Sequence, residues 1–539
     1  SPASRASCSP PPGPDAMLES LSEFLAPPRV LTALALLRGA FCVAAAALVL
    51  RACFHFAPYR IGHRVRLMLF PLLFCAAAAA TLAYQARWQL LGFTDRRFVA
   101  YMERHNVRPD NAAHHLFRGS LFDRAGRPLA YTDPDGSGRR IYPYEAATAH
   151  VVGFRHPSEG LTGMEGAADD LLSGWRQLAT AQDVREAGRT ALQGADRHIG
   201  TNLTLTVDAR LQLRAHTLLA GRRGAAVALD PRTGEVLLLC SSPSFDPNRY
   251  DRRLNVDPDS PLLNRALHGR YPSGSTFKTA IAGLMVDRGV PQTLDCPAEG
   301  YRAPGARRPI RDHEYYAYEK KGLAWPGFGA LGLDQALSKS SNVYFAHAGV
   351  LCGVDAFNAL AERLRFNERI RLYTNGAHRV SSQRGNLPRL GRAEKRELAQ
   401  CSIGQGRLLA TPLHLALLVS AIANHGVMMA PRLALDSEPE ALGRVFSARA
   451  ADRVAAAMRG VVKTGTARKA DLPGLEVRGK TGTAQNPGGE DHAWFVCFAS
   501  RPGEEPSIAV AVVVENAGFG SAAALPVAVG ILEEFFGAP

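Results

Sequence analysis

Apolar positions along the chain follow two patterns: long uninterrupted runs near the amino terminus and shorter, alternating runs in the later part. Residues 67–86 carry no charged side chain over 20 positions, which is the length of an α-helix that spans a bilayer. Residues 30–50 are also apolar but contain Arg38. We therefore predict a membrane anchor over residues 30–90, with spans at 30–50 and 67–86. The alternative for 30–50 is a helix that lies in the membrane interface.

Basic residues set the expected orientation of this anchor. Arg60, Arg64 and Arg66 stand just before the second apolar run, and positively charged flanks remain on the cytoplasmic side. Everything beyond the run is therefore expected outside the membrane. A cleaved signal peptide is not expected, because the apolar runs are too long and begin too late. Residues 1–29 are predicted to be a disordered or terminal tail, in which Met17 is a plausible natural start.

The region after the anchor divides into an irregular part and a regular part. Residues 91–200 are polar with short strand-like pieces, and we predict a linker domain there. From residue 201 the pattern becomes regular, with an alternating strand at 201–208 that leads into a helix. Residues 224–230 and 235–242 are two apolar runs joined by a Pro-Arg-Thr-Gly turn, which is typical of a β-hairpin.

Helical stretches are predicted from residue 275 to about 465, and strands return near the carboxyl terminus. These strands are expected at 474–483, 492–500 and 507–516, followed by a helix at 525–536. Strands at both ends of one domain, with helices between them, predict a single antiparallel sheet. The fold class expected for residues 201–539 is therefore α+β, with a five-stranded antiparallel sheet flanked by helices.

Charge and cysteine content exclude some classes of function. The formal net charge is +14, which favours anionic partners such as a membrane surface. No nucleic-acid-binding motif accompanies this charge, so nucleic acid is not an expected partner. The nine cysteines form no C-x-x-C pair, so neither a zinc site nor a redox framework is expected. A disulfide between Cys296 and Cys352 is one hypothesis; most other cysteines are expected to be buried free thiols.

A serine and a lysine three residues apart form the first candidate chemistry. Ser275 stands at the start of a predicted helix and Lys278 lies one turn on, so the two side chains share one helix face. A serine hydroxyl becomes a strong nucleophile when an adjacent base removes its proton, and a buried lysine can be that base. Taken alone, S-x-x-K is more often a capping serine with a surface lysine.

Two further motifs follow along the chain. Ser340 and Asn342 can project a hydroxyl and an amide from a helix junction, although such residues also cap helices. Lys480 ends a predicted strand and supplies a cation. The residues after it are Thr481, Gly482 and Thr483. Hydroxyls beside a cation can hold a carboxylate, and a glycine leaves room for a substrate backbone along the strand. The alternative is an ordinary edge strand.

The sequence Lys-Thr-Gly-Thr-Ala occurs twice, at 463–467 and at 480–484. The first copy follows an amphipathic stretch that has Ser447 as its expected cap and Gly460 as its expected end. The second copy follows an alternating segment and precedes another strand, so it is one arm of a hairpin. We predict that the second copy forms the strand of the site.

The three motifs, in this order and spaced by 65 and 140 residues, resemble those of the serine penicillin-recognising enzymes. Further segments are similar to the class B penicillin-binding proteins: 118–124 with Gly126, Leu129 and Ala130; Gly160, Gly163 and Glu165; 242–248; 403–406 with Thr411 and Pro412; and 492–495. The chain departs from that family at 307–332, where a short link is usual, and at 365–367, where a Gly-rich turn is usual. The double apolar run also departs from it.

The resemblance implies a peptidoglycan D,D-transpeptidase. Ser275 would attack the bond between the last two D-alanines of a stem peptide, with Lys278 as its base, and β-lactams would acylate the same serine. The other motif residues would orient the lysine and bind the terminal carboxylate: Ser340, Asn342, Lys480, Thr481, Gly482 and Thr483. The amides of Ser275 and Thr483 would form the oxyanion hole.

The resemblance also sets the expected location and partners. The catalytic domain would lie on the periplasmic side of the bacterial cytoplasmic membrane, and a RodA/FtsW-type glycosyltransferase would polymerise the glycan. The alternatives are a β-lactamase or a β-lactam-binding sensor of the same fold, or a non-enzymatic scaffold. A β-lactamase is shorter and has no linker region, a sensor carries a cytoplasmic effector, and a scaffold would have lost Ser275 or Lys480.

Overall fold

The computed structural model describes residues 116–135, 138–156, 159–174, 197–198, 200–376, 378–486 and 488–537, together with Arg51, Phe74, Ala78 and Thr81. The predicted span at 30–50 lies outside the described residues. Of the span at 67–86, only Phe74, Ala78 and Thr81 are described, and they are helical and exposed. Contacts divide the chain into two units, residues 1–101 and residues 102–539.

Among the described residues, no single helix is both long enough and apolar enough to cross a bilayer. One bent pair of helices, Asn342–Cys352 with Val354–Arg363, is long and apolar enough by length and composition only.

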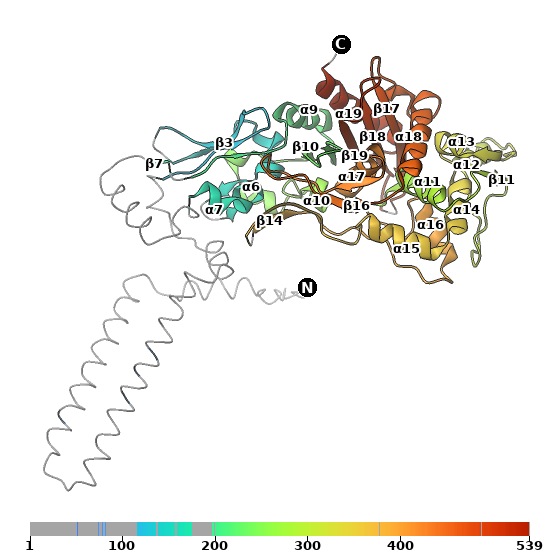
Figure 1. The fold of residues 1–539 in the computed structure, drawn as a ribbon, viewed down its shortest axis with the longest axis horizontal. Coiled ribbons are helices and arrows are strands. Elements are labelled where there is room, and N and C mark those ends of the chain that lie inside the picture. The colour runs from blue at the N-terminus through green and yellow to red at the C-terminus, as the bar shows by residue number, and fades with distance from the viewer. Residues whose placement is uncertain are drawn as a thin grey trace, which may run out of the picture. The chain divides into compact units, whose positions relative to one another are not determined.

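The larger unit is built around a five-stranded antiparallel sheet (Figure 1). Its strand order is β10-β9-β19-β18-β17. The strands are β9 (Gly224–Leu229), β10 (Val236–Ser242), β17 (Glu476–Ala484), β18 (His492–Ser500) and β19 (Ile508–Val514). The predicted five-stranded sheet, made from both ends of the domain, is therefore confirmed. Strand β17 lies at one edge.

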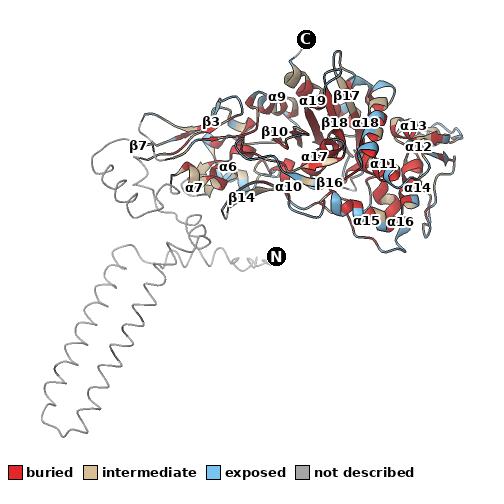
Figure 2. Cartoon of the chain, in the orientation of Figure 1, coloured by how far each residue is buried: buried red, intermediate tan, exposed pale blue. Residues whose placement is uncertain are grey.

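Helices cover this sheet, so its strands are apolar on both faces. Every residue of β9, β10 and β19 is buried, and Figure 2 shows the sheet as the buried centre of the unit. Helices α9 (Ala209–Leu219) and α19 (Gly520–Phe536) pack together against it. So do α17 (Pro412–Ala423) and α18 (Ala448–Lys463). This double cover explains why these strands show continuous apolar runs rather than strict alternation.

The segment between the two halves of the sheet carries most of the helices. A short 3₁₀ turn, η6 (Gly274–Phe277), leads directly into α11 (Lys278–Asp287). Farther along, α13 (Leu333–Lys339) is followed at once by α14 (Asn342–Cys352). The remaining helices of this segment are α10 (Arg265–His268), α12 (His313–Glu319), α15 (Val354–Arg363) and α16 (Lys395–Ser402).

Small sheets, which the sequence pattern did not predict, lie between the helical stretches of this region. The pairs are β11 (Thr293–Cys296) with β12 (Gly329–Gly332), β13 (Arg371–Asn375) with β14 (His378–Ser381), and β15 (Val427–Met429) with β16 (Ala441–Arg444). Each strand is too short to show a period of its own. Pairing with a distant partner, rather than local pattern, makes these segments extended.

Two details of helices and cysteines also differ from the sequence predictions. Ser447 caps α18 as expected, but the helix continues through Gly460 to Lys463. A glycine ends a helix when it adopts positive φ, and Gly460 does not. Cys296 and Cys352 are both free, so the hypothesis of a disulfide between them is wrong. Cys296 lies beside Ser341 at the start of α14, whereas Cys352 ends that helix, about 15 Å away at 1.5 Å per residue.

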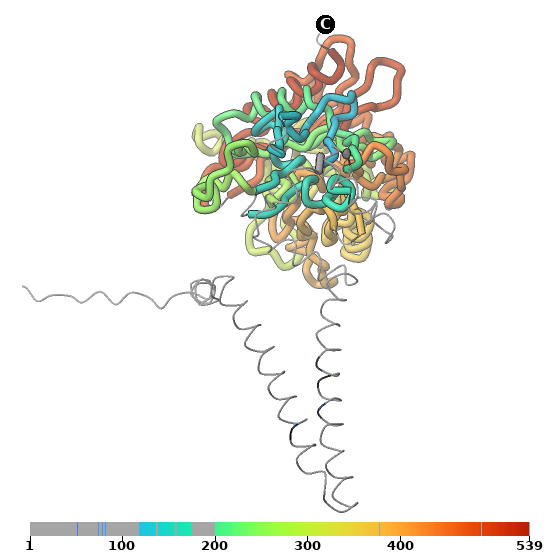
Figure 3. Tube along the Cα trace, turned by 90° about the vertical axis from the view of Figure 1, so that its left-hand side faces the viewer, coloured from blue at the N-terminus to red at the C-terminus, as the bar shows by residue number. Residues whose placement is uncertain are grey.

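The linker region forms a second, smaller sheet of order β4-β3-β2-β8. Its strands are β2 (Leu121–Phe122), β3 (Pro128–Thr132), β4 (Arg140–Ile141) and β8 (Leu203–Thr204). Strand β8 pairs in parallel with β2, so the strand predicted near residue 201 joins the linker sheet. Figure 3 looks onto this end of the unit, where the linker segments, coloured blue to teal, face the viewer.

The other elements of the linker are short. They are β1 (Leu116–Phe117) paired with β7 (Arg197–His198), β5 (Arg155–His156) paired with β6 (Gly160–Leu161), α5 (Ala149–Val152), α6 (Gly163–Ala167) and α7 (Asp169–Leu172).

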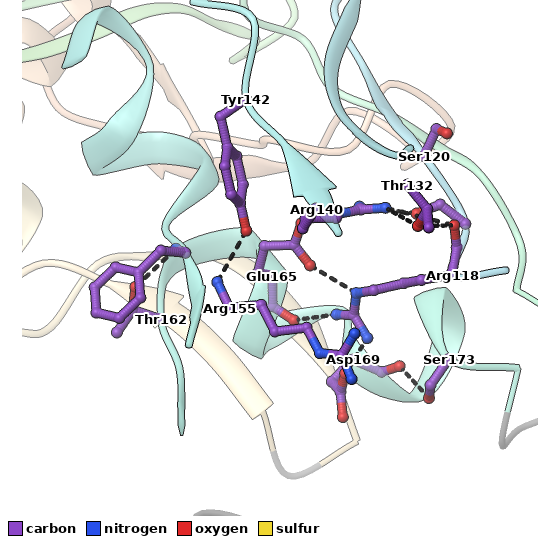
Figure 4. Close-up of polar contacts among 12 residues, drawn as sticks. Arg118, Ser120, Thr132, Arg140, Tyr142, Arg155, Thr162, Glu165, Asp169 and Ser173 are labelled. Carbon is purple, nitrogen blue, oxygen red and sulfur yellow. Dashed lines mark hydrogen bonds and ion pairs between the residues drawn. The ribbon is translucent and has the colours of Figure 1, made fainter. Parts of the chain in front are cut away.

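A buried cluster of charges holds the linker together (Figure 4). Glu165 is fully buried and accepts from Arg118 Nε at 2.7 Å and from Arg140 Nε at 2.6 Å. Arg118 also pairs with Asp169. Burial would raise the pKa of Glu165, but the two guanidinium groups hold it below its ordinary value. Because a buried charge is tolerated when it is paired, these residues fix how α6 packs on the linker strands.

Candidate active site

The serine of the first motif is placed by a close backbone contact. Gly274, just before Ser275, has a φ of 53°, and a Cβ added there would meet the Thr483 carbonyl oxygen at 2.5 Å. Glycine is therefore required for η6 to lie against β17. Ser275 is half-buried and lines a cleft of about 770 Å³. Within the described part of the chain, its hydroxyl makes no hydrogen bond, so its oxygen is free to meet a ligand.

Lys278, one turn after Ser275, points into the protein and is fully buried. Its Nζ donates to the Ser340 carbonyl oxygen at 2.6 Å and to Asn342 Oδ1 at 2.7 Å. Burial lowers the pKa of Lys278 to about 7, against the opposing charges of Asp312 and Glu314. An amine with that pKa can accept and return a proton near neutral pH.

The S-x-N residues lie at the junction of two helices, as the sequence predicted. Ser340 ends α13 with a φ of 58°, a left-handed conformation that is strained for a residue with a side chain. Asn342 is the first residue of α14. The sharp reversal between the helices presents both the carbonyl of Ser340 and the side chain of Asn342 to Lys278.

A second buried lysine reaches the same junction from the sheet. Lys480 on β17 is fully buried, and its Nζ donates to Ser340 Oγ and to the Thr481 carbonyl oxygen, each at 2.9 Å. Lys278 Nζ also lies 3.4 Å from Ser340 Oγ. Burial, and then the positive charge of Lys278, lower the pKa of Lys480 well below its ordinary value. The hydroxyl of Ser340 therefore connects the two lysines.

The residues after Lys480 have different surroundings. Thr481 and Thr483 line the cleft, while Lys480 lies beneath them. Gly482 does not line it: a Cβ there would meet Thr276 Cγ2 at 2.8 Å and Trp494 Cβ at 3.0 Å. The close packing of the Ser275 turn on β17 therefore requires this glycine. The expectation that it also leaves room for a substrate backbone stays a prediction.

The two copies of the duplicated motif lie in different elements. The copy at 480–484 lies in β17, whereas Lys463 is the last residue of α18 and is exposed. The Lys463 Nζ contacts Asp471 Oδ2 at 3.1 Å. The prediction that the second copy forms the site strand is consistent with this arrangement.

The structure adds two residues that sequence reasoning missed. Asp312 lies in the segment at 307–332 and accepts hydrogen bonds from the amides of Asn342 and Val343 and from Ser341 Oγ. Thr466, in the first copy of the duplicated motif, has its Oγ1 2.6 Å from Thr481 Oγ1. The unusual sequence at 307–332 and the duplication itself were the available signals for these two residues.

The arrangement places the partly exposed hydroxyl of Ser275 beside a network of two buried amines and a second hydroxyl, that of Ser340. Such a site can perform nucleophilic acyl transfer, with the serine as nucleophile and a lysine as base. Among the described residues, no group of three or more histidine, cysteine, aspartate or glutamate side chains is placed to hold a metal ion.

Comparisons with known proteins agree with this geometry. Residues 224–534 match the family described as the penicillin-binding protein transpeptidase domain. The peptidoglycan D,D-transpeptidase PbpA of Mycolicibacterium smegmatis is 32% identical over 437 residues, which are 73% of this chain and 83% of that relative. The peptidoglycan D,D-transpeptidase MrdA of Acinetobacter baumannii is 32% identical over 71% of this chain, and the match spans 64% of that longer relative.

Solved structures show the same likeness over a similar length. Penicillin-binding protein A from M. tuberculosis, as its ceftriaxone acyl-enzyme complex, has a TM-score of 0.68 at 28% identity, covering 78% of this chain and 99% of that one. Pseudomonas aeruginosa PBP2 in complex with WCK 5153 has a TM-score of 0.63 at 32% identity, covering 78% and 96%.

Proposed function

This chain belongs to the class B penicillin-binding protein transpeptidases, and we propose that it cross-links peptidoglycan stem peptides through an acyl-enzyme on Ser275. It is a serine-type D,D-transpeptidase, the activity for which its relatives are named. The observation that carries the residue assignment is the buried Lys278, which lies one turn from Ser275 and is held by the S-x-N junction. A β-lactamase or sensor of the same fold is not favoured, because the matched relatives are named transpeptidases.

The first half of the reaction forms the acyl-enzyme. Ser275 Oγ attacks the carbonyl between the two terminal D-alanines and passes its proton to Lys278 Nζ. The resulting oxyanion is stabilised by the backbone amides of Ser275 and Thr483, whose segments are in contact. When the tetrahedral intermediate collapses, Lys278 returns the proton to the departing amine, and D-alanine leaves.

The second half transfers the acyl group to an acceptor. An amine of a neighbouring stem peptide attacks the ester carbonyl and gives a proton to Lys278 Nζ. The Ser275–acyl bond then breaks, and Ser275 Oγ takes the proton back. One lysine therefore accepts and donates a proton once in each half, which requires a pKa near neutrality such as the value of about 7 for Lys278.

The carboxylate of the terminal D-alanine is proposed to bind over β17. Thr481 and Thr483 offer hydroxyls at the cleft surface, and Lys480 lies beneath them. A bound carboxylate would favour the charged form of Lys480, because an opposite charge raises the pKa of a buried amine. Ser340 and Asn342 hold the position of both lysines.

The setting of the enzyme is also part of the proposal. We infer an anchor in the cytoplasmic membrane at residues 30–90, with the catalytic domain on the periplasmic side and a RodA/FtsW-type glycosyltransferase as partner. The support is the uncharged run at 67–86, the basic residues before it and the resemblance to the class B proteins.

Labelling with a fluorescent penicillin, followed by mass spectrometry of the digested protein, tests the nucleophile. We expect the adduct on Ser275 and no labelling of Ser275→Ala. Ser521, another serine that lines the cleft, provides the control, and Ser521→Ala should be labelled normally. An adduct on another serine, or labelling that persists in Ser275→Ala, would contradict the assignment.

A further inference from the structure

The segment at 307–332 that departs from the family pattern forms one wall of the active-site cleft. The segment contributes Arg307, Arg308, Arg311 and Tyr316 to the cleft lining. Ala303 and Ala306, just before it, line the cleft as well. The same cleft is lined by Ser275, Thr481 and Thr483, where the proposed reaction takes place. A ligand that fills the cleft from Ser275 would therefore reach this wall.

The wall is fixed to the catalytic motifs. Its loop closes through two backbone hydrogen bonds between Tyr301 and Ile310, at 2.9 and 2.8 Å. The carbonyl oxygen of Arg311 accepts from Asn342 Nδ2 at 3.0 Å, and Asp312 accepts from the first turn of α14. The arginines at the tip of the loop are thus held at a set distance from the S-x-N junction.

The charges that line the cleft as a whole are unbalanced. Five basic side chains line the cleft, Arg307, Arg308, Arg311, Lys339 and Arg396, against the carboxylates of Glu314 and Asp491. Within the described part of the chain, neither Arg307 nor Arg308 makes an ion pair. A cleft lined by one sign of charge concentrates field and attracts ligands of the opposite charge.

The cleft volume of about 770 Å³ is that of a site for a drug-sized ligand, which is larger than a terminal dipeptide. We propose that Arg307 and Arg308 form a subsite for a second carboxylate of the stem peptide. This proposal rests on the proposed function. If Thr481 and Thr483 hold the terminal carboxylate, the rest of the stem peptide precedes the scissile bond, so the second carboxylate lies on the acyl side.

Two penicillins that differ by one carboxylate on the acyl side test this subsite. The probes are benzylpenicillin and α-carboxybenzylpenicillin, and the measured quantity is the ratio of their second-order acylation constants on the full chain. In Arg307→Gln/Arg308→Gln, we expect the ratio of carboxylated to uncarboxylated drug to fall about threefold to tenfold. Raising the salt concentration should lower the same ratio in the wild type, because exposed charges are screened.

Two variants provide the controls. Arg302 lies in the same loop and is exposed but does not line the cleft, so Arg302→Gln should leave the ratio unchanged. Arg307→Lys/Arg308→Lys keeps the charge and should retain most of the preference. The subsite is overturned if benzylpenicillin still acylates Ser275 and the ratio of the two acylation constants is the same in the wild type and in the double glutamine variant. Loss of acylation by both drugs in the wild type would instead overturn the proposed function, and the subsite with it.

A second inference concerns the first copy of the duplicated motif, which the proposed reaction does not use. Its Gly465 lies against α13: a Cβ there would meet the Ser338 carbonyl oxygen at 2.8 Å. Its Thr466 contacts Thr481 on β17 through the two hydroxyls, 2.6 Å apart. The segment therefore bridges the helix that carries Ser340 and the strand that carries the proposed carboxylate-binding threonines.

The geometry points to Thr466 as a positioning residue for Thr481. A threonine hydroxyl rotates freely unless a partner fixes it, and Thr466 is that partner. With Thr466 in place, Thr481 keeps one orientation toward the cleft. Removing the Thr466 hydroxyl should weaken ligand binding without removing the nucleophile or its base.

Thr466→Val removes the hydroxyl and keeps the shape of the side chain. We expect the dissociation constant of the initial penicillin complex to rise about threefold to tenfold, with the acylation step itself unchanged. Thr466→Ser should restore wild-type binding. Thr464 is the matched control, because this residue is exposed and its hydroxyl donates to the Gly460 carbonyl oxygen at 3.1 Å.

The unfolding temperature should be the same for Thr466→Val, Thr466→Ser and the control Thr464→Val. The proposal is overturned if Thr466→Val binds penicillin like the wild type, if Thr466→Ser binds no better than Thr466→Val, or if Thr464→Val shows the same loss. If the wild type itself is not acylated, the proposed function of Ser275 and Lys278 is wrong, and the inference about Thr466 falls with it. This outcome therefore distinguishes a failure of the proposed function from a failure of the Thr466 inference alone.

Discussion

Two buried lysines contact the same hydroxyl, that of Ser340, in this protein. We expect their different protonation states to follow from that contact. Lys278 and Lys480 lie 3.4 and 2.9 Å from Ser340 Oγ. Two ammonium groups so close together repel each other, so the charge on one disfavours the charge on the other. Lys278 is held by a carbonyl and an amide oxygen one turn from the proposed nucleophile, Ser275, and Lys480 lies under the threonines that face the cleft. The neutral amine is therefore expected at Lys278 and the cation at Lys480 when a carboxylate is bound.

The pH dependence of acylation tests the role of Lys278. The base must be neutral to accept the serine proton, and burial lowers the pKa of Lys278 to about 7. The acylation constant should therefore rise as the pH increases through about 7, and fall about tenfold per pH unit well below that value. Stopped-flow measurement with a fluorescent penicillin provides the profile. A rate that does not change between pH 6 and pH 8 would exclude Lys278 as the titrating base.

Lys278→Arg provides the control for this profile. Arginine stays protonated in proteins, so the variant should be almost inactive at every pH and should show no rise near pH 7.

The two lysines of the duplicated motif provide a second test at this scale. Lys480→Ala removes a buried cation from beneath Thr481 and Thr483, and the acylation constant should fall by about two to three orders of magnitude. Lys463→Ala removes an exposed lysine that pairs with Asp471, and its effect should stay within about twofold. Acylation constants of both variants with one labelled penicillin decide the matter. A larger loss at Lys463 would overturn the site described here.

Among the elements, α14 matters most for the site, because its first residue holds the proposed base. The amides of its first two residues, Asn342 and Val343, would lack partners if Asp312 did not accept from them. Asp312 is 2% exposed, and it comes from a segment that packs against α14 from outside the helix. The carboxylate also complements the positive end of the helix dipole. The segment at 307–332 therefore supports the motif that follows it in the sequence.

Replacing Asp312 should loosen both the helix and the site. Asp312→Ala leaves the amides of Asn342 and Val343 and the hydroxyl of Ser341 without their acceptor, so the free energy of unfolding should fall by about 2 kcal/mol. Acylation should fall as well, because Asn342 would no longer hold Lys278 in place.

Urea unfolding and penicillin acylation measure these two effects. Asp334, in the first turn of α13, is the control: it is exposed and pairs with Arg453. Asp334→Ala should change the stability by no more than about 0.5 kcal/mol. Equal effects of the two substitutions would show that Asp312 has no special role.

For the molecule as a whole, the sheet topology brings the motifs together. Ser275 follows the hairpin of β9 and β10, and Lys480 lies on β17 at the opposite edge of the sheet. The chain returns from the helical region to place β19 beside β9, and the 3₁₀ turn at Ser275 then packs on β17. A site made from such distant segments depends on the complete domain.

The orientation in the membrane is a prediction for the whole chain. Because Arg60, Arg64 and Arg66 precede the uncharged run at 67–86, the catalytic domain should lie outside the cytoplasmic membrane. Protease added to intact spheroplasts should degrade everything beyond about residue 90. The control is a cytoplasmic protein, which should survive until the membrane is permeabilised. Protection of the carboxyl-terminal region in intact spheroplasts would show that the orientation is wrong.

The sequence alone determined the features that depend on neighbouring residues. Alternating and continuous apolar runs located the five strands, Ser447 marked the start of α18, and the hairpin context distinguished the two copies of the duplicated motif. The motifs also identified Ser275, Lys278, Ser340, Asn342 and Lys480 as candidates, because their chemistry and order are visible without coordinates.

Only the tertiary structure decided the features that depend on distant partners. The short hairpins became extended by pairing, Gly460 stayed helical, and Gly482 turned out to pack against Thr276 and Trp494. Asp312 and Thr466 belong to the site because they contact Asn342 and Thr481, respectively. The depressed pKa of Lys278 likewise comes from its burial. Burial, close approach and hydrogen-bond partners arise when remote segments pack together, and the local pattern of one segment does not contain them.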